Sequence, residues 1–390
     1  MKIRAAAFAF ILVCFALFAP VIPQDARTRA NVSGEAGAFP EYDPFCFDDT
    51  DALCVSASAA VLMEAESGRV IYSKSPHKRL PMASTTKIMT SLLACEILPP
   101  DRVVTVTKDT TDIEGSSVYL TEGETLTVRE LVYCAMLRSG NDAAQTLAKA
   151  CGGSVENFVS LMNLRARALG LENTRFANPS GLPAEGHYTT AYDLAAIACA
   201  ALKNEEFAKI AGTLRITVCG GKRTLINRNK LISLYDGMTG VKTGYTPEAG
   251  HCLVTSATRN GVTLVAVTLN DSDQWTNHRK MLDYGFETLE RICVSGAGTL
   301  KAELDAVGGD REKAAAQNAE DVYFVLPKGA EITFIHEKPR MIYAPVERGD
   351  ILCRVRVYAD GCYVGDIPLR AEYGIGYPKT NLFERLISRK

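Results

Sequence analysis

The segment from residue 240 to residue 270 constrains the fold most, because it combines three strand-like runs with a hairpin turn. The runs cover 240–246, 250–258 and 262–270, and Asn260-Gly261 separates the last two. An Asn-Gly pair is the strongest short hairpin signal, since both positions of a type I′ turn need positive φ. A two-residue turn joins antiparallel strands, whereas parallel strands need a longer crossover. The segment therefore predicts an antiparallel meander and argues against a doubly wound parallel sheet.

Helical patterns occupy much of the chain before this meander, and one more follows it. Apolar residues recur at helical spacing in the segments 84–97, 128–137, 141–151, 156–169, 191–202 and 277–292. Near the N-terminus, 57–66 and 70–75 are strand-like on either side of Ser67-Gly68. A helical block between strands at both ends predicts an α/β (α+β) fold with an antiparallel sheet.

The N-terminus has the plan of a secretory signal. Lys2 and Arg4 precede an apolar run from Ala5 to Ile22, and a basic start before an apolar stretch is typical of exported proteins. The run is also long enough for a short membrane anchor. We therefore expect residues 1–23 to be either a signal peptide or an N-terminal anchor. The protein would be exported, either to the outer face of the cytoplasmic membrane or as a secreted protein.

Changes in composition divide the rest of the chain. Residues 24–55 are polar and irregular and are expected to be a leader, and 56–293 contain the helical block and the meander. The small residues of 295–298 predict a domain boundary. Residues 300–376 alternate like short strands, which predicts a small C-terminal β domain. Residues 377–390 are either an interfacial helix at a membrane surface or a frayed tail.

Charge and cysteine content exclude several classes of function. The formal net charge of −2 leaves no basic excess to meet phosphates, so no nucleic-acid partner is expected. No Cys/His spacing resembles a metal site, so neither a metal nor another cofactor is expected. Cys46 and Cys54 are the one close cysteine pair in a predicted loop. A two-residue turn would place Cys362 opposite Ala359, which argues against a disulfide with Cys353.

Two Ser-x-x-Lys motifs compete as a nucleophile with its base. A serine hydroxyl needs a neighbouring base in order to attack, and residues three apart meet on one face of a helix. Ser75 and Lys78 are bracketed by prolines, which disfavour a helix there. Ser84 and Lys87 instead open a helical pattern. Ser84 is therefore either the nucleophile or simply an N-cap, a position that serine favours.

Two later segments favour the nucleophile. Ser139-Gly140-Asn141 forms a tight connection between two predicted helices. Lys242-Thr243-Gly244 lies on the first strand of the meander, which we expect to be central in the sheet. A cation, a hydroxyl and a glycine there would let a substrate backbone lie along the strand without a side-chain clash. Each segment is a weak signal alone, but their order and separation together are specific.

This order of Ser-x-x-Lys, Ser-x-Asn and Lys-Thr-Gly resembles that of penicillin-binding proteins and class A β-lactamases. More narrowly, the chain is similar to the D-alanyl-D-alanine carboxypeptidases among the low-molecular-weight penicillin-binding proteins. The resemblance covers residues 55–290 and rests on the segments ASTTKIMT, LVYCAMLRSGNDAAQTLA, ANPSGL, HYTTAYDLA, NRNKL and GVKTGYTPEAG. It implies a penicillin-binding/β-lactamase-like transpeptidase fold, followed by the second, β-rich domain that these enzymes carry.

The resemblance also implies a role for each motif residue. Ser84 would be the acylated nucleophile, and Lys87, neutral in a desolvated site, would be the base that takes its proton. Ser139 would relay a proton toward the leaving D-alanine. Asn141 would hold Lys87 and a substrate amide.

The same resemblance implies a substrate-binding site along the meander strand. Lys242 and Thr243 would bind the terminal carboxylate of the substrate beside Gly244, with Arg228 adding charge. The backbone N–H groups of Ser84 and Tyr245 would form the oxyanion hole.

The implied reaction is that of a serine-type D-Ala-D-Ala carboxypeptidase. Peptidoglycan stem pentapeptides would acylate Ser84, release D-alanine and then be hydrolysed, and β-lactam antibiotics would be inhibitors. The alternatives are a D,D-endopeptidase acting on peptidoglycan cross-links, a class A-like β-lactamase and a non-catalytic wall-binding protein. Ser-Gly-Asn in place of Ser-Asp-Asn, and the lack of a Glu-x-x-Leu-Asn loop motif, argue against the β-lactamase. Asp142 and His187 lie in matching segments, and we expect both to be structural.

Overall fold

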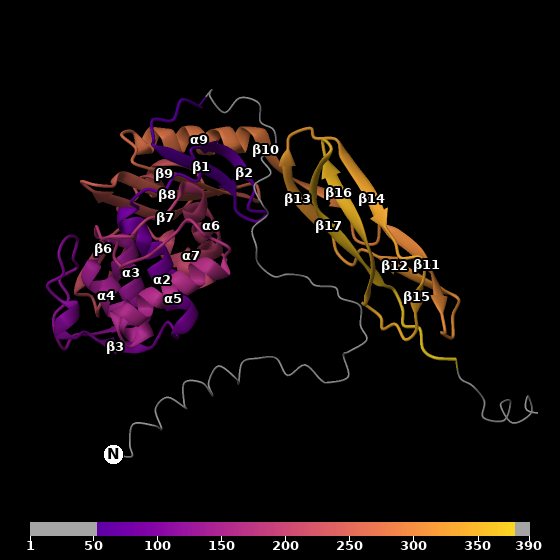
Figure 1. Ribbon diagram of the computed structural model, residues 1–390, viewed down its shortest axis with the longest axis horizontal. Helices are drawn as coiled ribbons and strands as arrows, with labels where there is room; N and C mark the ends of the chain where they lie inside the picture. Colours follow the sequence, from indigo (N-terminus) through magenta and orange to yellow (C-terminus); the bar gives the residue numbers. More distant parts are fainter. Residues whose placement is uncertain (1–52, 379–390) are drawn as a thin grey trace, which may run out of the picture. The chain divides into compact units, whose positions relative to one another are not determined.

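The computed structural model describes residues 53–378. The predicted signal or anchor, most of the predicted leader with Cys46, and the tail from residue 379 lie outside this range. Among the described helices, none is both long and apolar enough to cross a membrane. The described chain forms a main body of helices around one sheet and then a run of strands (Figure 1).

The main body is built on a five-stranded antiparallel sheet. In order across the sheet, the strands are β2 (Val70–Lys74), β1 (Ala59–Glu64), β9 (Val262–Leu269), β8 (Gly250–Arg259) and β7 (Met238–Thr246). Asn260 and Gly261 join β8 to β9 with φ angles of 49° and 78°, as the hairpin turn requires. The antiparallel meander predicted from the sequence is confirmed.

The position of β7 in the sheet differs from the prediction. The strand that carries Lys242-Thr243-Gly244 was expected to be central, but it lies at the edge and pairs only with β8 among the named strands. Within residues 53–378, no strand after the meander pairs with the open side of β7. An edge strand has backbone N–H and C=O groups on one side that no strand pairs, and an extended peptide can add there.

Helices cover both faces of this sheet (Figure 1). Successive residues of β1 enter different cores, because side chains alternate across a strand. Val61 and Met63 pack with the helical block, whereas Ala60 and Leu62 pack with α9 (Gln274–Thr288). The block comprises α2 (Lys87–Ile97), α3 (Val128–Leu137), α4 (Asn141–Gly152), α5 (Val155–Ala168), α6 (Ala191–Leu202) and α7 (Glu205–Ala211).

Two helices, α3 and α6, have the bounds predicted from the sequence. At both, a capping signal coincides with the start of the apolar periodicity. Thr127 and Glu130 form a capping box before α3, and the Thr190 hydroxyl accepts a hydrogen bond from the Asp193 N–H at the start of α6. These side chains satisfy backbone N–H groups that would otherwise have no partner in the first turn.

The helix predicted for 277–292 ends earlier in the structure. α9 stops at Thr288, and Leu289–Ser295 forms strand β10, antiparallel to β13 (Val322–Pro327). Side chains of β10 alternate between more and less exposed positions, which is the strand period. The pairing with a strand that lies beyond the next 25 positions of the sequence decides the conformation, and local periodicity does not report such a partner.

Several short elements connect the longer ones and were not predicted. They are β3 (Val103–Thr105), the 3₁₀ turn η3 (Lys108–Thr110), β4 (Thr125–Thr127), β5 (Arg215–Val218), β6 (Arg223–Ile226) and α8 (Leu231–Leu234). β3 pairs with β4, and β5 pairs with β6. The loop between β3 and β4 and the β5–β6 hairpin both matter for the site described next.

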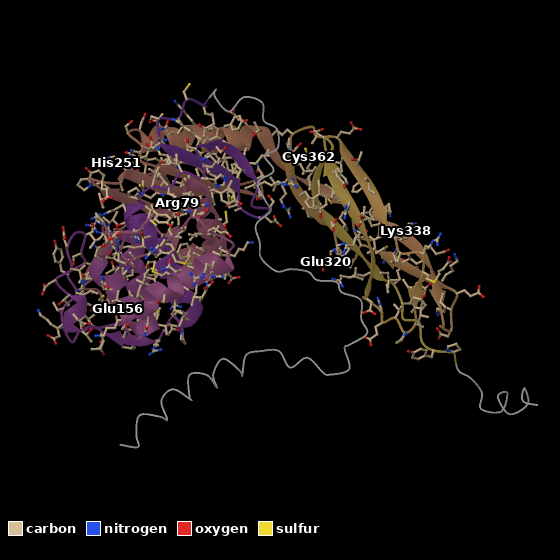
Figure 2. The ribbon with its side chains drawn as sticks, viewed as in Figure 1. Arg79, Glu156, His251, Glu320, Lys338 and Cys362 are labelled. Carbon is tan, nitrogen blue, oxygen red and sulfur yellow. The ribbon has the colours of Figure 1, made fainter. Side chains whose placement is uncertain are left out.

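The C-terminal part is a second, all-strand region with its own core. A six-stranded sheet has the order β14 (Ile332–Glu337), β16 (Ile351–Ala359), β17 (Cys362–Ala371), β12 (Lys313–Gln317), β11 (Lys301–Val307) and β15 (Ile342–Tyr343). Cys362, labelled in Figure 2, pairs with Ala359, and Cys353 pairs with Leu369. Both thiols are free, as the predicted register requires.

Candidate active site

Ser84 lies in a 3₁₀ turn, η2 (Ala83–Thr86), directly before α2. The sequence placed Ser84 at the start of the α-helix itself, but the α-helix begins at Lys87 and has Thr86 at its N-cap position, with no side-chain cap. The interpretation of Ser84 as an N-cap is therefore wrong. The Thr86 hydroxyl donates to the Ala83 carbonyl at 2.8 Å and helps to hold the turn.

The other Ser-x-x-Lys motif is not helical. Ser75 has a positive φ of 46°, and the Lys78 N–H donates to the Ser75 carbonyl at 3.1 Å, which closes a turn. The structure therefore confirms that this copy lies in a turn.

The amine of Lys87 lies at the centre of a buried cluster. Its Nζ is 3.0 Å from Ser84 Oγ, 2.7 Å from Asn141 Oδ1 and 2.5 Å from the Ser180 carbonyl oxygen. Lys87 is fully buried, whereas Ser84 is partly exposed. The structure thus joins Lys87 to two segments that lie 54 and 93 positions away in sequence, and Ser180 is a member that sequence reasoning missed.

The pKa of Lys87 lies well below its usual value, first because burial penalises the charged amine. The positive charges of Lys242 and Arg228 lower it further, and Asp142 opposes them. A neutral amine has two N–H groups and one lone pair. Because the Ser180 carbonyl and Asn141 Oδ1 can only accept hydrogen bonds, they take both N–H groups and leave the lone pair for the Ser84 hydroxyl.

Asn141 is fixed by its own backbone and side-chain contacts at the start of α4. Its Nδ2 donates to the Glu114 carbonyl at 2.6 Å and its N–H donates to the Ser116 carbonyl at 2.7 Å. The amide orientation follows, because Nδ2 faces a carbonyl and only Oδ1 can face Lys87. Ser139, two residues earlier, is buried in the left-handed region with φ of 64°. Its hydroxyl makes no hydrogen bond to any residue in the range 53–378.

The loop that contains Ser180 is built by Asn178. Asn178 Oδ1 accepts hydrogen bonds from the N–H groups of Ser180 at 3.1 Å and Gly181 at 2.7 Å. Gly181 has φ of 90°, and a Cβ there would lie 1.9 Å from the Ala83 carbonyl oxygen. The Asn-Pro-Ser-Gly sequence of this loop is typical of a turn and entered the sequence analysis only as part of the family resemblance. It did not reveal that a backbone carbonyl there holds Lys87.

Strand β7 packs against the turn that carries Ser84. A Cβ on Gly244 would lie 3.1 Å from the Ser84 backbone nitrogen and 3.2 Å from Ala83 Cβ. The sequence assigned this glycine to making room for a substrate, whereas its nearest neighbours are the protein's own atoms. The contact brings the backbone of Lys242-Thr243-Gly244 beside Ser84.

The cationic end of the site is on β7 and on the segment after β6. Lys242 is buried, and burial together with the nearby Arg228 lowers its pKa to about 7. Its Nζ donates to the Thr243 carbonyl at 2.9 Å. Arg228 is exposed and donates to Ser116 Oγ at 3.0 Å. Tyr245 follows on β7, with 59% of its surface exposed.

Asp142 and His187 have structural contacts, as expected. The Asp142 carboxylate accepts backbone hydrogen bonds from Val118 and Leu120. His187 Nδ1 accepts from the Ala177 N–H at 2.9 Å, so its proton is on Nε2, which lies 2.8 Å from Thr86 Oγ1. Burial, and then the charge of Lys87, lower the pKa of His187 to about 4.

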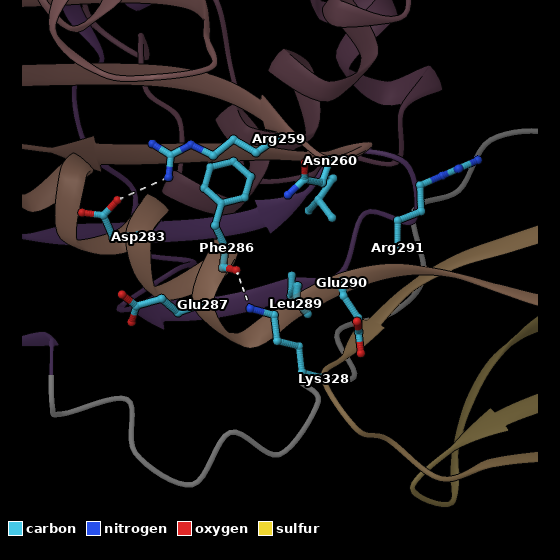
Figure 3. Close-up of a pocket in the computed structure, with 10 residues that line it drawn as sticks. Arg259, Asn260, Asp283, Phe286, Glu287, Leu289, Glu290, Arg291 and Lys328 are labelled. Carbon is cyan, nitrogen blue, oxygen red and sulfur yellow. Dashed lines mark hydrogen bonds and ion pairs between the residues drawn. The ribbon is translucent and has the colours of Figure 1, made fainter.

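A separate pocket of about 490 Å³ lies beside the β8–β9 turn and contains none of these residues (Figure 3). Two of its cationic side chains, Arg259 and Lys328, contact other residues of the protein. Arg259 lies 4.8 Å from the Phe286 ring and 3.8 Å from the Asp283 carboxylate, and Lys328 donates to the Phe286 carbonyl at 3.1 Å. Within 53–378, no cluster of His, Cys, Asp and Glu is arranged to hold a metal ion.

Comparison with known proteins gives the same family in sequence and in structure. The profile of the Peptidase_S11 family, described as D-alanyl-D-alanine carboxypeptidase, matches residues 48–273. The chain is 35% identical over 337 residues to D-alanyl-D-alanine carboxypeptidase DacF of Bacillus subtilis, which covers 83% of this chain and 87% of that protein. It is 32% identical over 340 residues to DacC of Escherichia coli, covering 82% and 84%.

Solved structures extend the similarity to the fold. Penicillin-binding protein 5 of Haemophilus influenzae superposes with a TM-score of 0.72 and 28% identity, covering 83% of this chain and 98% of that one. The Streptomyces K15 DD-transpeptidase superposes with a TM-score of 0.58 and 35% identity, covering 60% and 98%. The expected fold class, with an antiparallel sheet, a helical block and a C-terminal β region, is confirmed.

Proposed function

The chain belongs to the D-alanyl-D-alanine carboxypeptidase family of serine-type hydrolases, and we propose that Ser84 is the nucleophile that its substrate acylates. The observation that carries this proposal is the position of the buried Lys87 amine. Its Nζ lies 3.0 Å from Ser84 Oγ, and Asn141 Oδ1 and the Ser180 carbonyl oxygen accept its N–H groups. A base whose pKa is lowered by burial and whose lone pair is aimed at one hydroxyl is what a nucleophilic serine requires. The substrate we infer is a peptidoglycan stem peptide that ends in D-Ala-D-Ala.

In the proposed acylation, Ser84 Oγ attacks the carbonyl carbon of the penultimate D-alanine while its proton moves to Lys87 Nζ. The N–H groups of Ser84 and Tyr245 would stabilise the oxyanion, and the packing of Gly244 against the Ser84 nitrogen supports this pairing. The C–N bond then breaks, and the leaving amine takes the proton from Lys87 through Ser139, which returns Lys87 to its neutral form. D-Alanine departs and leaves an ester on Ser84.

In the proposed deacylation, water takes the place of the departed amine. Lys87 accepts a proton from the water, the hydroxide attacks the ester carbon, and the C–O bond to Ser84 breaks as the serine regains its proton. The products are the shortened peptide with a new carboxylate and the free enzyme. Asn141 holds Lys87 through both steps by the 2.7 Å contact.

The carboxylate of the terminal D-alanine would bind at Lys242, Thr243 and Arg228. Two cations and a hydroxyl suit a carboxylate, and the edge position of β7 leaves room for the substrate backbone to pair along the strand. The dipeptide end would thereby be held with its scissile carbonyl at Ser84.

Penicillin labelling tests the nucleophile. Intact-protein mass spectrometry after incubation with benzylpenicillin should show one covalent adduct on the wild type and none on Ser84→Ala. Ser75→Ala, in the motif that forms a turn, is the matched control and should label like the wild type. An adduct that survives in Ser84→Ala would refute the assignment.

Two substrates separate the carboxypeptidase from the endopeptidase. We measure both reactions by chromatography and expect release of D-alanine from a pentapeptide muropeptide to be much faster than cleavage of a cross-linked dimer. Faster cleavage of the dimer would contradict the preference. Slow recovery of the penicillin-acylated protein, over minutes or longer, is expected, whereas turnover within seconds would indicate a β-lactamase.

We also propose that the enzyme acts outside the cytoplasmic membrane, where its wall substrate lies. The support is the predicted signal or anchor at residues 1–23. Protease added to intact cells with a permeabilised wall should degrade the full chain. Deletion of residues 1–23 should leave the protein protected in the cytoplasm, and equal accessibility of both forms would contradict export through this segment.

A further inference from the structure

The loop between β3 and β4 reaches the candidate active site through residues 114–120, here termed the rim segment. The Glu114 and Ser116 carbonyls accept hydrogen bonds from Asn141, at 2.6 Å and 2.7 Å. Ser116 Oγ accepts from Arg228 at 3.0 Å. The rim segment therefore contacts both the residue that holds Lys87 and a cation of the proposed carboxylate site.

A buried carboxylate and a half-buried guanidinium hold the rim segment on both sides of Tyr119. The Asp142 carboxylate accepts from the N–H groups of Val118 and Leu120, at 3.1 Å and 3.0 Å. Arg223 donates to the carbonyls of Val118 and Tyr119, at 3.1 Å and 2.9 Å. The side chains of Val118 and Leu120 are buried. The backbone around Tyr119 is thus fixed by groups from α4 and from the β5–β6 hairpin.

Tyr119 itself is displayed to solvent. Its backbone is left-handed, with φ of 60°, and its side chain is 82% exposed, more than any other large hydrophobic residue in 53–378. A left-handed conformation costs a residue with a Cβ about 1–2 kcal/mol. Such strain persists only where the surroundings impose it, and it gathers at functional sites. Here the surroundings hold a large ring outward, with most of its surface exposed to solvent.

We propose that Tyr119 is a substrate-binding residue whose ring stacks on the donor substrate beyond the D-Ala-D-Ala end. The ring would cover a flat apolar face, supplied either by the stem peptide or by the sugar that the stem carries. The proposal rests on the function proposed for Ser84. From Ser116, which contacts Arg228, three residues span at most about 11 Å, so the ring lies within reach of a substrate longer than a dipeptide.

A fixed aromatic ring suits this role physically. Tyrosine offers a large amphipathic surface with few rotatable bonds, so little entropy is lost on contact. Binding energy from parts of a substrate remote from the scissile bond can raise the rate of the chemical step. Tyr119 would thereby favour long stem peptides over short ones, without touching the reacting atoms.

The test replaces the ring while keeping the backbone. Asparagine tolerates the left-handed region, so Tyr119→Asn should preserve the rim segment, and Tyr119→Trp should preserve the stacking. The matched control is Tyr343→Ala, which removes a 70% exposed tyrosine from the C-terminal strands. Values of kcat/KM are measured on a blocked tripeptide ending in D-Ala-D-Ala, a pentapeptide and a disaccharide pentapeptide, together with the acylation rate by benzylpenicillin.

We expect Tyr119→Asn to lower kcat/KM on the long substrates by about three- to tenfold. The tripeptide and penicillin rates should stay within twofold, and Tyr119→Trp and Tyr343→Ala should resemble the wild type. A loss on both long substrates assigns the contact to the stem peptide, and a loss on the disaccharide substrate alone assigns it to the sugar. No loss on either, or an equal loss on all substrates and penicillin, would overturn the proposal.

Binding without turnover separates this proposal from the assignment of Ser84. Calorimetric titration of the disaccharide pentapeptide into Ser84→Ala and into Ser84→Ala/Tyr119→Asn needs no catalysis. Weaker binding by the double variant supports the role of Tyr119 even if Ser84 proves not to be the nucleophile. Equal Kd values for the two would contradict it.

Discussion

The pKa of Lys242 leads to a specific pH dependence of catalysis. Only the protonated amine can form an ion pair with the substrate carboxylate, and burial and Arg228 lower its pKa to about 7. kcat/KM reports ionisations of the free enzyme. The fraction of protonated Lys242 falls about tenfold between pH 6 and pH 8 for a pKa near 7. We therefore expect kcat/KM for a pentapeptide to fall by about the same factor over this interval.

The variant Arg228→Gln tests the cause of that fall. Removing the guanidinium removes the like charge that helps to lower the pKa of Lys242, so the descending limb should move to higher pH. The rate below pH 7 should also drop, because the carboxylate loses one cation. Lys87 must be neutral to act as the base, and burial lowers its pKa, so its ionisation should produce an ascending limb. Because the two lysines interact, the two apparent pKa values of the pH profile belong to the pair, and both limbs of the profile are fitted together.

The assay is the initial rate of D-alanine release at substrate concentrations far below KM, from pH 5 to pH 9. Circular dichroism at each pH controls for unfolding. A flat profile between pH 6 and pH 8 in the wild type would refute the assignment of Lys242 as a titrating carboxylate ligand. A descending limb that stays in place in Arg228→Gln would refute the electrostatic cause.

Three further predictions follow from burial and close packing. The pKa of Lys242 is lower in the folded chain, so between pH 10.5 and about pH 7 only the unfolded chain binds this proton, and the free energy of unfolding falls by about 5 kcal/mol as pH falls through this window. Lys242→Met should remove this pH dependence and raise the free energy of unfolding, measured in urea at pH 7. A lower free energy of unfolding in this variant would contradict the prediction. Gly181→Ala should lower the free energy of unfolding by about 1–3 kcal/mol and slow acylation by penicillin, because the new Cβ meets the Ala83 carbonyl. The control is Gly123→Ala, at a position with positive φ but no neighbour within 4 Å, and this variant should leave acylation unchanged. Nitrogen NMR should show His187 neutral and protonated on Nε2 from pH 5 to pH 8, since its pKa is about 4, and a charged ring at pH 6 would oppose this.

Local signals account for the parts of the fold that could be predicted. Thr127 and Thr190 mark helix starts because capping involves neighbours in sequence, and Asn260-Gly261 marks the hairpin because positive φ is a property of single residues. The three motifs were found in order, and the structure brings Ser84, Lys87 and Asn141 within hydrogen-bond distance along one chain of contacts.

Non-local contacts account for what could not be predicted. Residues 289–292 were predicted to end a helix, yet they belong to β10 because β13 offers hydrogen bonds from a distant part of the chain. β7 lies at the edge of the sheet because no strand pairs with its second side, and the residues of β7 themselves give no signal of this. The same is true of the Ser180 carbonyl, which lies 93 positions from Lys87.

The sequence by itself determined the helix that follows the first motif, the strand that contains the third motif, and which serines were candidates for the nucleophile, since these depend on residues a few positions apart. Only the tertiary structure decided that Ser84 lies in a 3₁₀ turn, that β7 has a free edge, and that Lys87 is buried among two acceptors and two cations. Desolvation and charge repulsion act through space. A lysine becomes a base only when the folded chain removes water and surrounds it with such groups.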